Sequence, residues 1–132
     1  LFLPEGELHE LSLLFATYVI KSRQGRAIYL GQNLPIKDLG SVCEAYTPDF
    51  VFSVITSYPS AEEMLPYISE LRRRIGSTRI ILTGFQAIKM RDKLPDDILV
   101  VGNLDEFIDL VDSHTRGPAP QRMPNSKLTA TG

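Results

Sequence analysis

Two largely apolar stretches decide the fold: residues 49–55 read DFVFSVI, and residues 78–83 read TRIILT. Runs of this kind, without strict alternation of apolar and polar residues, are typical of strands buried on both faces of a parallel sheet. Two further runs have the same character. The sequence therefore predicts four strands, at Arg26–Gly31, Asp49–Ile55, Thr78–Thr83 and Asp97–Gly102.

Helical patterns lie between these strands. In the first, we expect the apolar residues at helical spacing to face the core; they are Leu8, Leu11, Phe15, Tyr18 and Val19. Similar stripes begin at Ile36, Leu65 and Leu104, and a short helix is expected near Gln86–Lys93. Two pairs indicate helix N-terminal caps, Ser60 with Glu63 and Asn103 with Glu106. Pro66 predicts a kink or a shifted helix start.

Strand–helix alternation with right-handed crossovers predicts an α/β fold with helices on both faces of the sheet. The fold class is a flavodoxin-like, Rossmann-like, doubly wound sheet of five parallel strands in the order 2-1-3-4-5. Its first strand must be residues 1–3, which indicates a truncated N-terminal strand and the C-terminal module of a longer protein. We expect a domain over residues 1–113 and a disordered tail over residues 114–132, which contains three prolines.

Charge and cysteine content exclude several classes of protein. All 16 acidic residues lie at or before Asp112, so residues 1–113 are acidic overall and do not resemble a surface that binds nucleic acid. The basic run at residues 72–74 is interpreted as the solvated end of a helix. The single cysteine, Cys43, cannot form an internal disulfide, and we expect it in the core of a cytoplasmic protein. No apolar run reaches membrane length, so no membrane partner is expected.

Topology predicts where a ligand would bind. In a doubly wound sheet, ligands bind beyond the carboxyl ends of the strands, where the strand order reverses. For the order 2-1-3-4-5 this point lies between the first and third strands. The loops expected to converge there are Pro4–His9, Ser53–Ser60 and Thr83–Gln86.

These three loops also contain a spaced motif. Glu7-Leu8-His9-Glu10-Leu11-Ser12 is followed after about forty residues by Ser53-Val54-Ile55, and after just under thirty more by Thr83-Gly84. The motif resembles the fingerprint of cobalamin-binding domains, Asp-x-His-x-x-Gly, Ser-x-Leu and Gly-Gly. The spacing is kept. Four positions depart from the consensus by one conservative step, namely Glu7, Ser12, Ile55 and Thr83.

The resemblance implies a base-off corrinoid with His9 as the lower axial ligand of cobalt, a role that suits a neutral imidazole. Glu7 is then expected to fix the histidine tautomer, directly or through a serine. The nucleotide tail would run down a slot beside the sheet. The implied cofactor-binding residues are Glu7, Leu8, His9, Ser12, Ser53, Ile55, Thr83, Gly84 and Phe85. Gly84 would clear the path of the tail; alternatively, it only serves the backbone.

The run at residues 3–16 is most similar to the C-terminal sensor domain of MerR-type transcription regulators, which include the CarH-like light sensors. This family implies cobalamin, for which adenosylcobalamin is one candidate form, as the partner of the chain. It further implies DNA binding only through an upstream domain, a homo-oligomer as one state of the full-length protein, and no catalysis.

Two other functions stay open. A corrinoid-carrying module of a methyltransferase or mutase is the first, and a ligand-free interaction domain of the same fold is the second. Other phosphate and nucleotide sites are not indicated, because the chain has neither a Gly-x-Gly-x-x-Gly motif nor a Walker loop. A receiver domain would need an aspartate at the end of its third strand, where this chain has residues 53–55.

Overall fold

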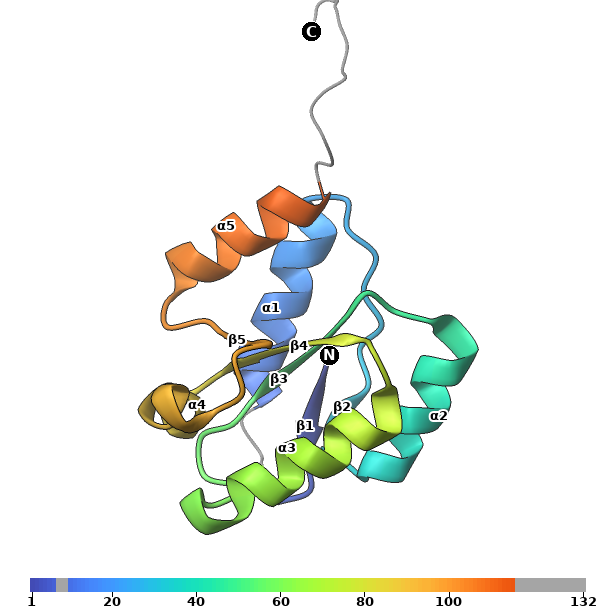
Figure 1. Ribbon diagram of the computed structural model, residues 1–132. Coiled ribbons are helices and arrows are strands. Elements are labelled where there is room, and N and C mark those ends of the chain that lie inside the picture. Colours follow the sequence, from blue (N-terminus) through green and yellow to red (C-terminus); the bar gives the residue numbers. More distant parts are fainter. Residues whose placement is uncertain (7–9, 116–132) are drawn as a thin grey trace, which may run out of the picture.

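The protein is a five-stranded parallel sheet with helices on both faces (Figure 1). This computed structural model describes residues 1–6 and 10–115. The strand order is β2-β1-β3-β4-β5, which confirms the flavodoxin-like α/β arrangement expected from the sequence. The strands are β1 (Phe2–Pro4), β2 (Gly31–Leu34), β3 (Phe50–Val54), β4 (Arg79–Thr83) and β5 (Ile98–Val100).

The helices divide between the two faces of the sheet, as Figure 1 shows. One face is covered by α1 (Glu10–Ser22) and α5 (Leu104–Thr115), and the other by α2 (Ile36–Tyr46) and α3 (Ala61–Ile75). The short α4 (Phe85–Lys89) and a 3₁₀ turn at Arg91–Lys93 connect β4 to β5. Each face has its own apolar core.

The central strand pair explains why the sequence reads as continuously apolar. β3 and β4 pair in register along five positions, from Phe50 opposite Arg79 to Val54 opposite Thr83. Along β3, Val51 faces the α2–α3 core, whereas Phe52 faces the α1–α5 core. Successive strand side chains point to opposite faces, and both faces are covered, so both sets must be apolar.

The second strand was predicted too early. The structure places β2 at Gly31–Leu34, whereas the sequence pattern indicated Arg26–Gly31. The apolar residues before Gly31 do approach the first strand, since the Leu30 N–H donates to the Leu1 carbonyl at 2.8 Å. Regular pairing with β1 begins only where Phe2 lies opposite Gly31. The middle residues of β2, Gln32 and Asn33, are polar and exposed, which suits a strand at the edge of the sheet, and Leu34 at its end packs against the α2–α3 core.

The apolar stripe expected to bury α1 was largely wrong. Val19 is buried as expected, but Leu11, Phe15 and Tyr18 are exposed, and the helix instead buries Leu13, Ala16 and Thr17. Leu8 lies outside the described residues. The Thr17 hydroxyl is satisfied locally, because it donates to the Leu13 carbonyl at 2.9 Å. The helix therefore has two apolar faces, and the sequence pattern selected the outer one.

Both predicted helix caps are present. The Glu63 carboxylate accepts hydrogen bonds from the Ser60 N–H at 3.1 Å and from the Ser60 hydroxyl at 3.0 Å. At the start of α5, the Glu106 N–H donates to Asn103 Oδ1 at 2.9 Å. Because the Ser60 cap fixes its start, α3 begins at Ala61 and continues through Pro66 to Ile75. The expected shift of the helix start at Pro66 was wrong.

The last helix, α5, runs past residue 113. α5 continues to Thr115, two residues beyond the predicted domain end at residue 113, and residues 116–132 lie outside the described part. His114 has a partner that the sequence did not indicate, since its ring packs edge-on against Phe50 with centroids 4.8 Å apart. Within residues 1–6 and 10–115, every helix is too short or too polar to traverse a lipid bilayer.

Candidate functional site

The loops after β3 and β4 are joined at the carboxyl edge of the sheet. The Ile55 N–H donates to the Thr83 carbonyl at 2.8 Å, and the Ile55 carbonyl accepts from the Gln86 N–H at 3.0 Å. The loop after β1 reaches the same place, because a Cβ on Gly6 would lie 3.2 Å from Cγ of Tyr58. The convergence of the three predicted loops is therefore confirmed for the residues that the structure describes.

Ser53 fixes the β1–β3 junction. Its side chain is only 1% exposed, and its hydroxyl donates to the Phe2 carbonyl at 2.8 Å. Phe2 also lies opposite Ser53 in the strand register. Ser53 thus links β1 to β3 next to the converging loops. Its hydroxyl hydrogen is already donated to a backbone carbonyl and is not available to a ligand.

We expect Ser53→Ala to lower the free energy of unfolding by about 1 kcal/mol, because it removes a buried hydrogen bond to the Phe2 carbonyl. Chemical denaturation of the wild type and the variant measures this loss. Ser113→Ala is a control, since that hydroxyl bonds at the exposed surface of α5 and its loss should change stability little. Equal stability of Ser53→Ala and wild type would show that the buried bond contributes nothing.

Thr83 and Gly84 follow β4 and contact the neighbouring chain segments. The Thr83 hydroxyl donates to the Val101 carbonyl at 2.6 Å, which joins the ends of β4 and β5. Gly84 has a φ of 102°, and a Cβ there would lie 2.5 Å from the Ile55 carbonyl oxygen. The backbone packing alone requires this glycine, so the alternative interpretation of Gly84 is favoured over the path of a nucleotide tail.

Exposed apolar side chains surround this edge of the sheet. Phe85, at the start of α4, is 66% exposed, and the Lys89 ammonium lies 5.9 Å from the centre of its ring. The other exposed members also come from helix starts or from the loop after β3. We call the set the apolar rim: Leu11, Tyr58, Phe85 and Leu104. Each of these side chains is individually exposed on a segment that follows a strand at the carboxyl edge of the sheet.

The first piece of the motif falls mostly outside the described residues. Glu7, Leu8 and His9 lie in the undescribed segment between β1 and α1, and Ser12 is exposed in the first turn of α1. Sequence reasoning missed one interaction next to this segment. The Tyr29 hydroxyl donates to the Glu10 carboxylate, and burial together with this bond raises the pKa of Tyr29 to about 12. Nothing in the linear sequence links these two residues.

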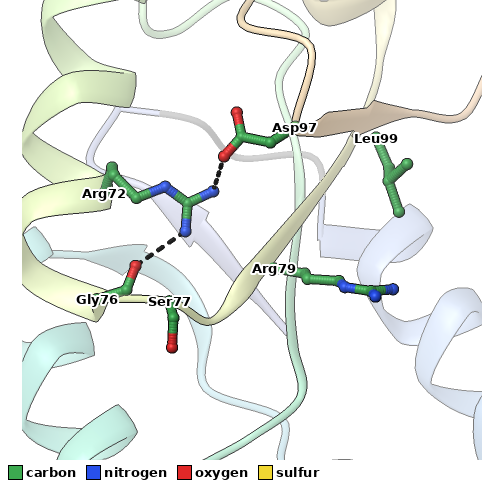
Figure 2. A pocket seen from close by; sticks show the side chains of 6 residues that line it. All are labelled: Arg72, Gly76, Ser77, Arg79, Asp97 and Leu99. Carbon is green, nitrogen blue, oxygen red and sulfur yellow. Dashed lines mark hydrogen bonds and ion pairs between the residues drawn. The ribbon is translucent and has the colours of Figure 1, made fainter.

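A hollow lies at the opposite, amino-terminal edge of the sheet (Figure 2). It has a volume of about 510 Å³ and lies between the end of α3 and the starts of β4 and β5. The Arg72 guanidinium in this hollow donates to the Gly76 and Thr78 carbonyls and forms an ion pair with Asp97 at 2.7 Å. Arg72 therefore links the end of α3 to the starts of β4 and β5. The hollow is separate from the loops that contain the motif.

The other two arginines of the basic run share one carboxylate. Arg73 and Arg74 both pair with Glu70, at 2.6 and 2.8 Å, on the exposed side of α3. This confirms the interpretation of the run as a helix end. Cys43 is buried in the α2–α3 core as predicted, and burial raises the pKa of its thiol. Among the described residues, no three His, Cys, Asp or Glu side chains gather in a way that could hold a metal ion.

Fold and site together define a parallel α/β domain in which the motif residues after β3 and β4 meet at the carboxyl edge of the sheet. No protein-family model matches the sequence. The chain is similar to the HTH-type transcriptional repressor CarH of Myxococcus xanthus, with 36% identity over 72 residues. The match covers 54% of this chain and 24% of the repressor, so the chain spans about a quarter of that relative's length.

Proposed function

We propose that this chain is the cobalamin-binding sensor module of a MerR-type transcription regulator, with the corrinoid held base-off and His9 as the lower ligand of cobalt. One observation supports the proposal most strongly. The segments that contain Ser53, Ile55, Thr83 and Gly84 are joined at the edge from which the chain leads into α1. Two of the three motif pieces, far apart in sequence, thus lie at the edge where ligands of doubly wound sheets bind, which supports the proposal.

The described residues fit a large flat cofactor at this edge. The apolar rim offers exposed aromatic and aliphatic surface from three helix starts and one loop, which suits the lower face of a macrocycle. When bound, the corrinoid supplies a cobalt ion whose upper ligand can change, and that change is the signal that a sensor needs. His9 supplies the imidazole, and Glu7 holds its tautomer.

The motif hydroxyls have a more limited role than the sequence implied. The Ser53 and Thr83 hydroxyls already donate to the Phe2 and Val101 carbonyls. They therefore position the loops and offer the cofactor only the lone pairs of their oxygens. Glu7, Leu8, Phe85 and Ser12 remain the residues proposed to contact the corrinoid beside His9.

The similarity to a transcriptional repressor supports a regulator rather than an enzyme. DNA recognition would then come from a domain upstream of this chain. The excess of acidic residues in residues 1–113 agrees with DNA binding by another domain, because phosphate contacts need clustered cationic side chains. The three consecutive arginines do not supply such a cluster, since each is paired with a carboxylate.

The proposal predicts that the 132-residue chain retains one equivalent of cobalamin. The purified chain is incubated with hydroxocobalamin or adenosylcobalamin and then desalted, and the absorption spectrum of the protein fraction is recorded. We expect a bound corrinoid with the spectrum of a base-off, imidazole-ligated form. Free corrinoid passed through the same column is the control. A protein fraction without corrinoid absorption would overturn the proposal.

One observation favours a second candidate, a ligand-free interaction domain of the same fold. The described motif residues are satisfied without any ligand, because Ser53 and Thr83 bond to carbonyls and Gly84 packs on Ile55. The retention experiment separates the two functions, because an interaction domain would retain no cobalamin. In an interaction domain, the apolar rim would be a contact surface for another protein instead of a corrinoid surface.

A further inference from the structure

The two motif hydroxyls lie on opposite faces of the sheet. Ser53 is opposite Leu82 in the β3–β4 register, and Leu82 belongs to the α2–α3 core. Thr83 is opposite Val54, which belongs to the α1–α5 core. Because successive strand residues point to alternate faces, the Ser53 side chain points towards α2 and α3, and the Thr83 side chain points towards α1 and α5. A single slot beside the sheet therefore cannot be lined by both residues.

The α1–α5 face is filled by apolar side chains up to the carboxyl edge of the sheet. Leu3 of β1 and Leu13 of α1 are fully buried there. The rings of Phe52 and Phe107 pack between β3 and α5, with centroids 5.0 Å apart. Ser12, an implied cofactor-binding residue, is exposed in the first turn of α1 instead of facing this core. A nucleotide base laid along this face would have to displace closely packed side chains.

The α2–α3 face is filled in the same way. Ile55, Met64 and Leu82 are fully buried next to the end of β3. Ser53 points to this face, but its hydroxyl already donates to the Phe2 carbonyl at 2.8 Å. A nucleotide on this face would therefore have to displace the core and would find the Ser53 hydroxyl hydrogen already in use.

The backbone closes the passage between the loops after β3 and β4. A Cβ on Gly84 would lie 2.5 Å from the Ile55 carbonyl oxygen. The same carbonyl accepts hydrogen bonds from the Gln86 N–H at 3.0 Å and from the Ala87 N–H at 3.4 Å. Backbone atoms in such close contact occupy the space that a ribose and a phosphate would need to pass between these loops.

We propose that this chain recognises the corrin ring alone and leaves the nucleotide of the cofactor outside the protein. The inference rests on the proposed function, because it concerns how the same edge of the sheet holds the corrinoid. The ring lies on the apolar rim, and His9 takes the lower side of cobalt. The ligand class that suits this edge best is therefore a corrinoid without a nucleotide.

The nucleotide of cobalamin then works against binding. In free cobalamin, the base at the end of the nucleotide occupies the lower side of cobalt, and it must leave before His9 can ligate the metal. Apparent affinity falls in proportion to the fraction of molecules in the competent state. A slot that binds the displaced base would offset this loss, whereas a base released into water does not. Cobinamide, a corrinoid that lacks the nucleotide, avoids the loss altogether.

Titration of the 132-residue chain with adenosylcobalamin and with adenosylcobinamide, followed by absorption, tests this preference. The two compounds share the upper ligand and differ in the nucleotide. We expect adenosylcobinamide to bind at least about tenfold more tightly. Equal affinities, or tighter binding of adenosylcobalamin, would overturn this inference and leave the proposed function standing. If the chain binds neither compound, the proposed function is rejected and this inference with it.

A bulky substituent on the nucleotide tests the same inference in a different way. A dye attached to the ribose of adenosylcobalamin should leave its affinity for the chain unchanged, because the ribose stays in water. A large loss of affinity on attachment of the dye would show that the nucleotide enters the protein.

Ser53→Ala and Thr83→Val form a matched pair of variants, since each removes one hydroxyl and the two hydroxyls lie on opposite faces of the sheet. We expect the ratio of the two corrinoid affinities to equal the wild-type ratio in both variants, because neither hydroxyl contacts the nucleotide. A general loss of stability would change both affinities by the same factor and leave this ratio as it is. A ratio that shifts in either variant would place the nucleotide on that face and reject the inference.

Discussion

Gly84→Val is expected to destabilise the ligand-free chain by at least about 4 kcal/mol and to lower its melting temperature by about 15 °C or more. Two costs combine. The backbone at Gly84 has a φ of 102°, which side-chain-bearing residues rarely adopt. A Cβ would also lie 2.5 to 2.8 Å from the carbonyl oxygen, carbonyl carbon and nitrogen of Ile55, and backbone atoms cannot move aside cheaply. Thermal unfolding followed by circular dichroism measures the loss.

Gly76→Val is the matched control for this result. Gly76 also has a positive φ, 68°, but a Cβ there would meet no atom within 4 Å. We expect it to cost about 1–2 kcal/mol from the backbone alone. Similar losses in the two variants would show that the approach to Ile55 is not tight. A large loss at Gly84 alone would support the alternative interpretation, in which this glycine serves the backbone and not the path of a nucleotide tail.

The central strands were predictable because their environment is simple. β3 (Phe50–Val54) and β4 (Arg79–Thr83) lie within residues 49–55 and 78–83. Most of their side chains are buried on one face or the other, so a continuous apolar run is a sufficient signal. The edge strand β2 was not predictable in the same way. Its middle residues, Gln32 and Asn33, are polar and exposed, whereas Tyr29 and Leu30 pack against the two cores without forming the regular strand.

Helix α1 shows a different limit of sequence analysis. Helical periodicity identifies apolar stripes, but this helix has two, and spacing alone cannot say which of them faces the sheet. The stripe chosen from the sequence contained Leu11, Phe15 and Tyr18, and these are the exposed side chains. The excess of apolar residues was itself the signal, because a helix at the surface of one domain needs only one such stripe.

The candidate site was predictable in position but not in detail. Strand order alone brings the loops after β1, β3 and β4 to one edge of the sheet, and the structure confirms this meeting. The partners of the motif side chains are carbonyl groups of distant residues, Phe2 for Ser53 and Val101 for Thr83. Any residue offers a carbonyl, so no residue type in the sequence marks such partners.

His9→Ala is expected to weaken cobalamin binding at least about a hundredfold and to change the absorption spectrum of the remaining complex. The proposal assigns His9 the lower coordination site of cobalt, and loss of a metal ligand costs at least as much as loss of the residue that orients it. Titration of each chain with hydroxocobalamin, followed by absorption, gives both the affinity and the spectrum. The melting temperatures of the ligand-free proteins should agree.

His114→Ala is the matched control, because the chain has only two histidines. His114 lies in the last turn of α5 and packs on Phe50, at the start of β3 and thus away from the carboxyl edge of the sheet. It should retain the wild-type affinity and spectrum while losing some stability with the ring contact. If His9→Ala bound cobalamin with unchanged affinity and spectrum, the axial role would be rejected. Only His9 lies in the proposed site. If both variants lost binding equally, the loss would therefore come from reduced stability and not from a lost cobalt ligand.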